Sequence, residues 1–350
     1  MPQNRHELTE RERRILQAVV ESYIESAEPA GSRRIVQTHD LGVSPATVRN
    51  TMSDLEDKGF LSHPHTSAGR VPTDMAYRFY VDSLMGRSRV SSQQMASIEE
   101  HLAVPELSGI EVLFRRAAQV LGLLTGELGL AVSPTLASAI LLKLDLVAMD
   151  SEKALLVLTL ESGVVRSVYV DLPSVLPEET LQAVTRVLNE RLSGSSLMEI
   201  HRTLVDRLRD VRVPTREAES LVNIFVQSGP EIFDWVAQGG DVHFGQASVL
   251  AEQPEFTTGP SLKALLELTE RRDLLAKVLG ARACTDGPQI TIGAEHGTPE
   301  LADLTIITAP YTLNDLHGVV GVIGPTRMPY DKVISLVDCT SSLVANLVRH

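Results

Sequence analysis

The chain has 350 residues, 43% of them hydrophobic, so at about 150 residues per domain it is long enough for two or three domains, each with its own core. Its longest apolar stretches, such as residues 117–125, reach about half of the roughly 20 residues that cross a bilayer, which excludes a membrane-spanning helix. The N-terminus is charged where a secretory signal is apolar, and Cys284 and Cys339 form neither a metal-ligand spacing nor a disulfide framework, so we expect a reducing cytoplasm.

The net charge of −13 opposes long-range attraction to a polyanion, but it is unevenly distributed. Residues 1–89 hold 12 basic and 12 acidic residues, so the remaining 20 basic and 33 acidic residues carry the whole excess. A neutral segment with clustered arginines is compatible with nucleic-acid binding at this end of the chain. An ordinary solvated surface also accounts for the charge by itself.

The N-terminal segment predicts an amphipathic helix followed by a turn. Thr9 and Glu12 form a Thr-x-x-Glu capping box, and apolar residues recur at helical spacing from Ile15 to Ile24. A short second helix follows, and residues 40–43 turn the chain.

A third helix is predicted directly after this turn. Ser44 is suited to its N-cap, Pro45 to its first position and Gly59 to its C-terminal cap. Two short extended pieces at residues 60–63 and 70–71 then flank a loop. Three helices followed by a small hairpin predict a winged helix-turn-helix.

The rest of the chain predicts an α+β region interrupted by helices. Helical periodicity runs over residues 95–127, and a helix is predicted to close the chain over residues 330–349. Short Val- and Leu-rich runs between them predict strands at residues 140–150, 154–160, 164–170, 289–292, 304–308 and 319–323. We therefore expect a multidomain α+β protein, with an N-terminal domain over residues 1–89, an α+β domain over residues 95–173 and 281–350, and an inserted, mainly helical domain over residues 174–280.

The third helix has the amphipathic pattern of a recognition helix. At 100° per residue its apolar residues share one face, and Arg49, Asn50 and Ser53 point away from it. In a major groove an Arg can donate two hydrogen bonds to guanine and an Asn can bind adenine. Taken alone, an ordinary surface helix would show the same residues.

The context of this helix favours DNA binding over an ordinary surface. Ser44 and Thr47 at its start can donate to phosphates, as can the free backbone N–H groups there. The hairpin loop adds His65, Thr66 and Arg70, and a wing of this kind can contact the adjacent DNA backbone or minor groove.

Other motifs indicate no metal, cofactor or catalysis. The pair of histidines in residues 63–65 lacks a third and a fourth ligand nearby in the sequence. The glycines of residues 318–324 lead to a proline rather than into a helix, so they do not form a dinucleotide fingerprint. An enzyme, the alternative from another class, would need a convergent acid, base or metal constellation, and the sequence indicates none.

Five stretches are distinctive enough to identify a family: LTERERRILQAVVESY (residues 8–23), EPAGS (28–32), SPATVRNTMSDLEDKGFL (44–61), HTSAGRVPTDMAYRFYVDSL (65–84) and GVIGPTRMPYDKVI (321–334). They resemble the bacterial heat-inducible transcription repressor family, HrcA, and the similarity extends over essentially the whole chain. Residues 175–280 match only in general character.

This resemblance implies a homodimeric repressor that binds double-stranded DNA at an inverted-repeat operator, CIRCE, upstream of chaperone operons. It implies that the GroEL chaperonin keeps the repressor active, and that the fold combines a winged helix, a GAF-like domain and an inserted dimerisation domain. By position, the implied DNA contacts are Ser44, Thr47, Arg49, Asn50, Ser53, His65, Thr66 and Arg70. The alternative within this class is a winged-helix repressor that senses a small effector in its GAF-like domain.

Overall fold

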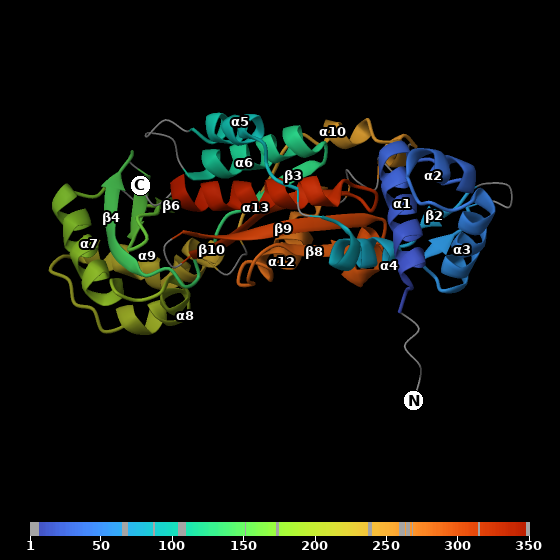
Figure 1. Ribbon diagram of the computed structural model, residues 1–350. Helices are drawn as coiled ribbons and strands as arrows, with labels where there is room; N and C mark the ends of the chain where they lie inside the picture. The colour runs from blue at the N-terminus through green and yellow to red at the C-terminus, as the bar shows by residue number, and fades with distance from the viewer. Residues whose placement is uncertain are drawn as a thin grey trace.

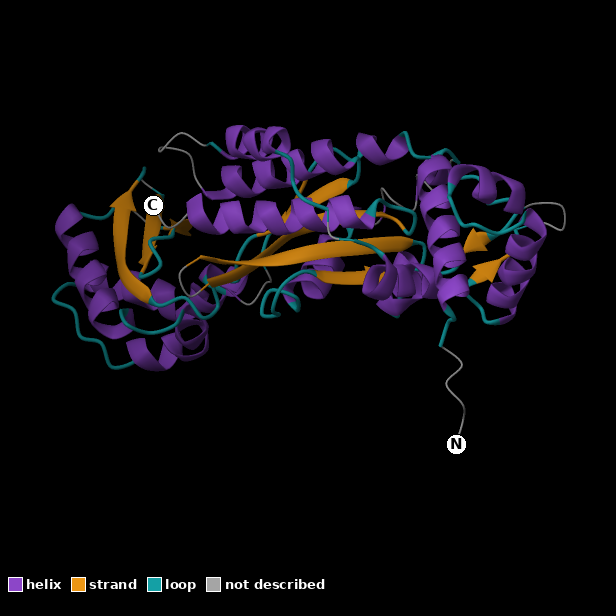
Figure 2. Ribbon diagram, in the orientation of Figure 1, coloured by secondary structure: helices purple, strands orange, loops and turns teal. Residues whose placement is uncertain are grey.

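The chain folds into an elongated mixed α+β molecule with three parts in a row (Figure 1). We call residues 7–86 the head, residues 92–132 and 240–347 the central part, and residues 139–236 the lateral part. The central part lies between the other two (Figures 1 and 2). The computed structural model describes residues 7–64, 69–86, 88–103, 110–150, 152–172, 175–236, 240–258, 263, 267, 269–313 and 316–347.

The head consists of short helices and one small hairpin, as its sequence pattern predicts. Its elements are α1 (Glu10–Ser26), α2 (Ser32–Thr38), α3 (Pro45–Asp57), β1 (Leu61–Ser62), β2 (Val71–Pro72), α4 (Asp74–Phe79) and the π-helical turn η1 (Tyr80–Leu84). The capping box of Thr9 and Glu12 is confirmed at the start of α1. The two short strands pair antiparallel directly after α3.

The central part is a five-stranded antiparallel sheet in the order β7-β3-β10-β9-β8. Its strands are β3 (Leu128–Val132), β7 (Val242–Phe244), β8 (Gln289–Ile292), β9 (Leu304–Leu313) and β10 (Leu316–Pro325). The predicted strands at residues 289–292, 304–308 and 319–323 are confirmed. Gly129 is needed in β3, because a Cβ at this position would lie 1.9 Å from the Ala118 carbonyl oxygen of the covering helix.

Helices cover both faces of this sheet. On one face lie α5 (Ser92–Leu102), α6 (Ile110–Thr125) and α13 (Tyr330–Leu347). On the other face α12 (Arg272–Gly280) packs against the strands through a second apolar cluster. The predicted closing helix is confirmed over its described residues. The short elements are α10 (Ser248–Ala251), η3 (Pro254–Phe256), η4 (Gly293–His296) and η5 (Pro299–Leu301). No helix in the described ranges is long and apolar enough for a bilayer crossing.

The lateral part has its own sheet and its own core. It contains β4 (Leu141–Ala148), β5 (Lys153–Leu160), β6 (Val165–Asp171), α7 (Glu178–Leu192), α8 (Leu197–Leu208), α9 (Arg216–Ile232) and η2 (Asp234–Val236). The three predicted strands are confirmed, and they pair antiparallel in the order β4-β5-β6. They do not join the central sheet, however, so the expected grouping of residues 95–173 with 281–350 has to be corrected. Alternate residues of β5 are buried toward α7–α9, and this burial fixes the sheet beside its helices.

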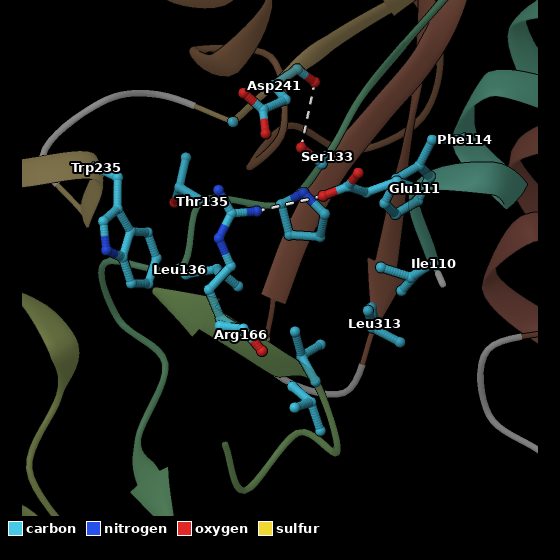
Figure 3. Close-up of a pocket in the computed structure, with 15 residues that line it drawn as sticks. Ile110, Glu111, Phe114, Ser133, Thr135, Leu136, Arg166, Trp235, Asp241 and Leu313 are labelled. Carbon is cyan, nitrogen blue, oxygen red and sulfur yellow. Dashed lines mark hydrogen bonds and ion pairs between the residues drawn. The ribbon is translucent and has the colours of Figure 1, made fainter. Parts of the chain in front are cut away.

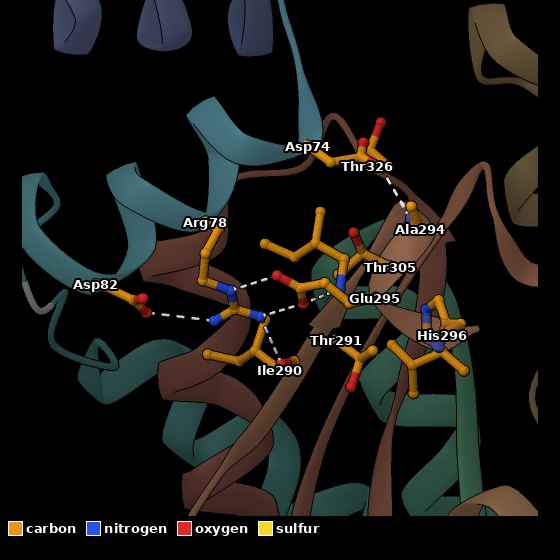
Figure 4. A network of polar contacts seen from close by, with 12 residues as sticks. Asp74, Arg78, Asp82, Ile290, Thr291, Ala294, Glu295, His296, Thr305 and Thr326 are labelled. Atoms are coloured by element: carbon orange, nitrogen blue, oxygen red, sulfur yellow. Dashed lines mark hydrogen bonds and ion pairs between the residues drawn. The ribbon is translucent and has the colours of Figure 1, made fainter. Parts of the chain in front are cut away.

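One continuous apolar core joins the head to the central part. Tyr77 of the head and Tyr330 of the central part are both buried, and the centres of their rings lie 5.9 Å apart. Beside them the guanidinium of Arg78 donates to both carboxylate oxygens of Glu295, over 2.7 and 2.6 Å, and to the Ile290 carbonyl over 2.7 Å (Figure 4). This bidentate geometry fixes the orientation of the planar guanidinium group as well as its position.

Two further polar contacts bind the head to the central part. Arg327 donates to both carboxylate oxygens of Glu255, over 2.6 and 3.0 Å, and to the Ile24 carbonyl at the end of α1 over 2.8 Å. The Asp74 carboxylate accepts from the backbone N–H of Ala294 over 2.9 Å. Because these contacts reach both α1 and α4, the head is held against the central part at more than one point.

Replacing Arg78 by alanine tests the contribution of this junction. We expect the free energy of unfolding to fall by about 1–3 kcal/mol, because the change removes charged hydrogen bonds at a partly buried site. Chemical denaturation followed by circular dichroism measures the loss. The matched control is Arg34→Ala, whose pair with Glu28 is exposed, with 46% and 70% of the two side chains accessible; here we expect a change below about 0.5 kcal/mol. Equal losses for the two variants would contradict the role of the junction.

Candidate nucleic-acid interface

Helix α3 begins where its sequence predicts, and it buries the predicted face. The Ser44 hydroxyl accepts from the backbone N–H of Thr47 over 3.2 Å, with Pro45 in the first turn. The buried residues of the apolar face are Val48, Met52 and Leu55. This face packs against α1 and α2, so the opposite face of α3 is directed away from the head.

The exposed face of α3 carries the hydrogen-bond donors that the sequence singles out. Arg49, Asn50 and Ser53 are exposed, and within the described part of the chain their side chains form no hydrogen bond or ion pair. The hydroxyls of Ser44 and Thr47 lie 3.0 Å apart at the start of the helix. The structure thus brings these five predicted residues together on one accessible surface.

The C-terminal end of α3 is anchored to α1 by a partly buried charge pair. Lys58 Nζ lies 2.6 Å from a carboxylate oxygen of Glu12. Burial works to raise the pKa of Glu12, but hydrogen bonds from Lys58 and Thr9 outweigh it, so the pKa of this carboxyl is lowered and its charged form is favoured. The pair fixes the direction in which α3 presents its exposed face.

The hairpin after α3 is fixed at its base. The backbones of Ala30 and Arg70 exchange two hydrogen bonds of 2.8 and 3.0 Å. A Cβ at Gly69 would lie 2.4 Å from the Ala30 carbonyl oxygen, so only glycine permits this close approach. The hairpin loop therefore starts from a defined position beside α3.

The side chain of Arg70 is occupied within the head. Its Nη2 lies 2.7 Å from a carboxylate oxygen of Glu56 on α3, and its Nη1 lies 2.8 Å from Nδ1 of His63. Only 17% of the Arg70 side chain is exposed. No sequence pattern indicates Glu56, because helical periodicity does not show which charge on a helix will pair with a neighbouring strand. His65 and Thr66 lie outside the described residues.

The arrangement on α3 is suited to the surface of a nucleic acid. Guanidinium and carboxamide groups match base edges, and hydroxyl and backbone N–H donors match phosphate oxygens. Asp54 and Asp57, farther along the helix, are exposed and would repel phosphates. Charge therefore disfavours close contact with a polyanion at the C-terminal end of α3.

No competing metal centre was found in the described ranges. No three His, Cys, Asp or Glu side chains within them lie close enough to hold a metal ion. Cys284 and Cys339 are free, and the Cys339 thiol contacts the sulfur of Met95.

The comparisons agree on one family. The family described as "HrcA protein C terminal domain" matches residues 111–334. A heat-inducible transcription repressor HrcA from Chlorobium chlorochromatii (strain CaD3) is 37% identical over 333 residues, covering 95% of this chain and 94% of the relative. The protein of that name from Chlorobium limicola (strain DSM 245 / NBRC 103803 / 6330) is 38% identical over 357 residues, covering 97% and 99%.

A solved structure supports the fold along the whole chain. A crystal structure described as that of a hypothetical protein aligns with a TM-score of 0.64 and covers 98% of this chain and 99% of that chain. Its sequence identity is 20%, so this likeness concerns the fold alone. The family match spans more than half of the chain, and each of the two relatives is covered to well over two thirds. The chain therefore belongs to the HrcA family.

Proposed function

We propose that this protein is a heat-inducible transcription repressor that acts in the cytoplasm and binds the CIRCE inverted repeat upstream of chaperone operons as a homodimer. The observation that carries the proposal is the exposed face of α3, where Arg49 and Asn50 have no partner in the described part of the chain. The head is then a winged helix-turn-helix, the central part a GAF-like domain and the lateral part the dimerisation domain.

The residues of the head divide into three roles in this proposal. Arg49 and Asn50 contact base edges in the major groove, and the hydroxyls of Ser44, Thr47 and Ser53 contact phosphates. Arg70 pairs with Glu56 and so positions the loop that carries His65 and Thr66. These two residues then reach the adjacent DNA backbone or minor groove.

A dimer follows from the symmetry of the operator, because an inverted repeat presents two half-sites related by a two-fold axis. We place the dimer contact on the face of the lateral sheet that is turned away from α7–α9. Val147, Leu155 and Tyr169 form a cross-strand row there, and 47% of Val147 and 66% of Tyr169 are exposed. A second copy of the same face would cover this apolar row and remove it from water.

The proposed dependence on GroEL fits the continuous core between the head and the central part. Because Tyr77 packs against Tyr330, the head is held in place only when the central part is folded. A central part that folds with difficulty would then need the chaperonin before the protein can bind DNA. Unfolded proteins that occupy the chaperonin during heat shock would leave the repressor inactive.

A second candidate function is a repressor that responds to a small effector. It is favoured by a cavity of about 460 Å³ between the central and lateral parts. An effector of this kind would change both the thermal stability of the protein and its affinity for the operator.

The proposed function is tested by an anisotropy titration on a duplex that contains the inverted repeat. We expect selective binding compared with a duplex in which one half-site is scrambled, and a larger active fraction when chaperonin and ATP are added. Equal binding to both duplexes under all conditions would refute the operator assignment. Selective binding without a chaperonin effect would instead favour the small-effector candidate.

Replacement of Arg49 by alanine tests the recognition role of α3. We expect operator binding to weaken by about 1–3 kcal/mol and the preference for the operator sequence to relax, because a bidentate contact to a base is lost. Arg70→Ala is expected to weaken binding to operator and scrambled duplexes alike. If both variants lose affinity without any change in sequence preference, the division of roles is wrong.

Replacement of Tyr169 by aspartate tests the dimer face. A charge in the middle of the apolar row should convert the protein to a monomer and reduce binding to the inverted repeat, because both half-sites can no longer be bound together. Light scattering after size-exclusion chromatography measures the mass. Tyr169→Phe keeps the apolar surface and should remain a dimer. A dimeric Tyr169→Asp variant would place the interface elsewhere.

A further inference from the structure

A cavity of about 460 Å³ lies where the central part meets the lateral part (Figure 3). Its walls come from the start of α6, the segment after β3, the start of β6, the turn η2, the segment before β7 and the end of β9. This volume lies within the roughly 300–1,000 Å³ that is typical of small-molecule sites. DNA binding by the head does not require such a cavity.

The apolar walls of the cavity are fixed in place. Phe114 and Leu313 are buried, and the indole N–H of Trp235 donates to the Ile232 carbonyl over 2.9 Å, which sets the plane of the ring. A Cβ at Gly240 would lie 1.8 Å from the Ser133 carbonyl oxygen, so the wall before β7 closes only with glycine at this position.

Arg166 provides a cation whose guanidinium group has further N–H donors available for a ligand. Its guanidinium carbon lies 5.2 Å from the centre of the Trp235 ring, within the range of a cation–π contact. Within the described residues the single hydrogen bond of this guanidinium group runs from Nη1 to a carboxylate oxygen of Glu111 over 3.3 Å. Because 55% of the Glu111 side chain is exposed, this pair contributes little and a ligand carboxylate can replace it.

Asp241 provides a carboxylate on another side of the same space (Figure 3). Its backbone carbonyl accepts from the N–H and the hydroxyl of Ser133, over 3.0 and 3.2 Å, so the backbone is held in place. Its side chain forms no hydrogen bond or ion pair in the described part of the chain. The cavity thus presents a cation and an anion beside the apolar side chains of Trp235, Phe114 and Leu313.

We propose that this cavity binds an α-amino acid with an apolar side chain. Arg166 pairs with the ligand carboxylate, Asp241 pairs with its ammonium group, and the apolar side chain lies against Trp235 and Phe114. An anion alone would pair only with Arg166, and a cation alone only with Asp241. A zwitterion with an apolar body satisfies both charges at once.

Trp235 is the only tryptophan in the chain, so its fluorescence reports on this cavity directly. The full-length protein is titrated with L-phenylalanine and L-leucine, and with 3-phenylpropionate and phenethylamine, which lack the amine and the carboxylate respectively. We expect a saturable change with at least one amino acid, and binding at least about tenfold weaker for both analogues. No saturable change with either amino acid, or equal binding of an analogue, would overturn the proposal.

Two variants locate the binding. Arg166→Gln and Asp241→Asn should each weaken amino-acid binding at least about tenfold, whereas Arg202→Gln, an exposed change on α8, should leave it unchanged. Unaltered binding in both cavity variants would overturn the assignment. Operator binding is measured separately and without amino acids, so failure of this proposal and failure of the repressor function give different results.

Discussion

The apolar contact between the head and the central part is the constraint on which the other features depend. Tyr77 and Tyr330 meet within one continuous core, and the bidentate pair of Arg78 with Glu295 fixes the angle between the two parts. A head on a flexible linker would bind DNA whatever the state of the rest of the chain. A head that shares its core with the central part is positioned only when the central part is folded, and this coupling gives the proposed chaperonin dependence a physical basis.

The same rigidity bears on how two heads would fit an inverted repeat. The lateral and head parts lie at opposite ends of the molecule, with the central sheet between them (Figures 1 and 2). If the dimer contact lies on the lateral sheet, the separation of the two recognition helices depends on every contact along this length. A loss of packing in the middle would then change the spacing of the heads, although no residue that touches DNA has changed.

The sequence predicts most reliably what depends on near neighbours. The capping box at Thr9, the N-cap at Ser44 and the buried face of α3 each involve residues a few positions apart, and the structure confirms all three. The strands at residues 140–170 were also identified, but alternation of apolar residues does not indicate which sheet a strand joins, and β3 and β7 were missed. Pairs such as Arg70 with Glu56 depend on tertiary packing, so no local pattern contains them.

The cavity and the head are connected through one apolar core. Phe114 lines the cavity and belongs to the same apolar core as Tyr77 in the head. A ligand alters operator affinity only if it binds two arrangements of the protein with different strength, however tightly it binds either one. Because the walls of the cavity come from both the central and the lateral parts, separating these parts would dismantle the site. An occupied cavity would therefore favour the arrangement in which the central and lateral parts are held together, and this arrangement fixes the distance between the lateral sheet and the head.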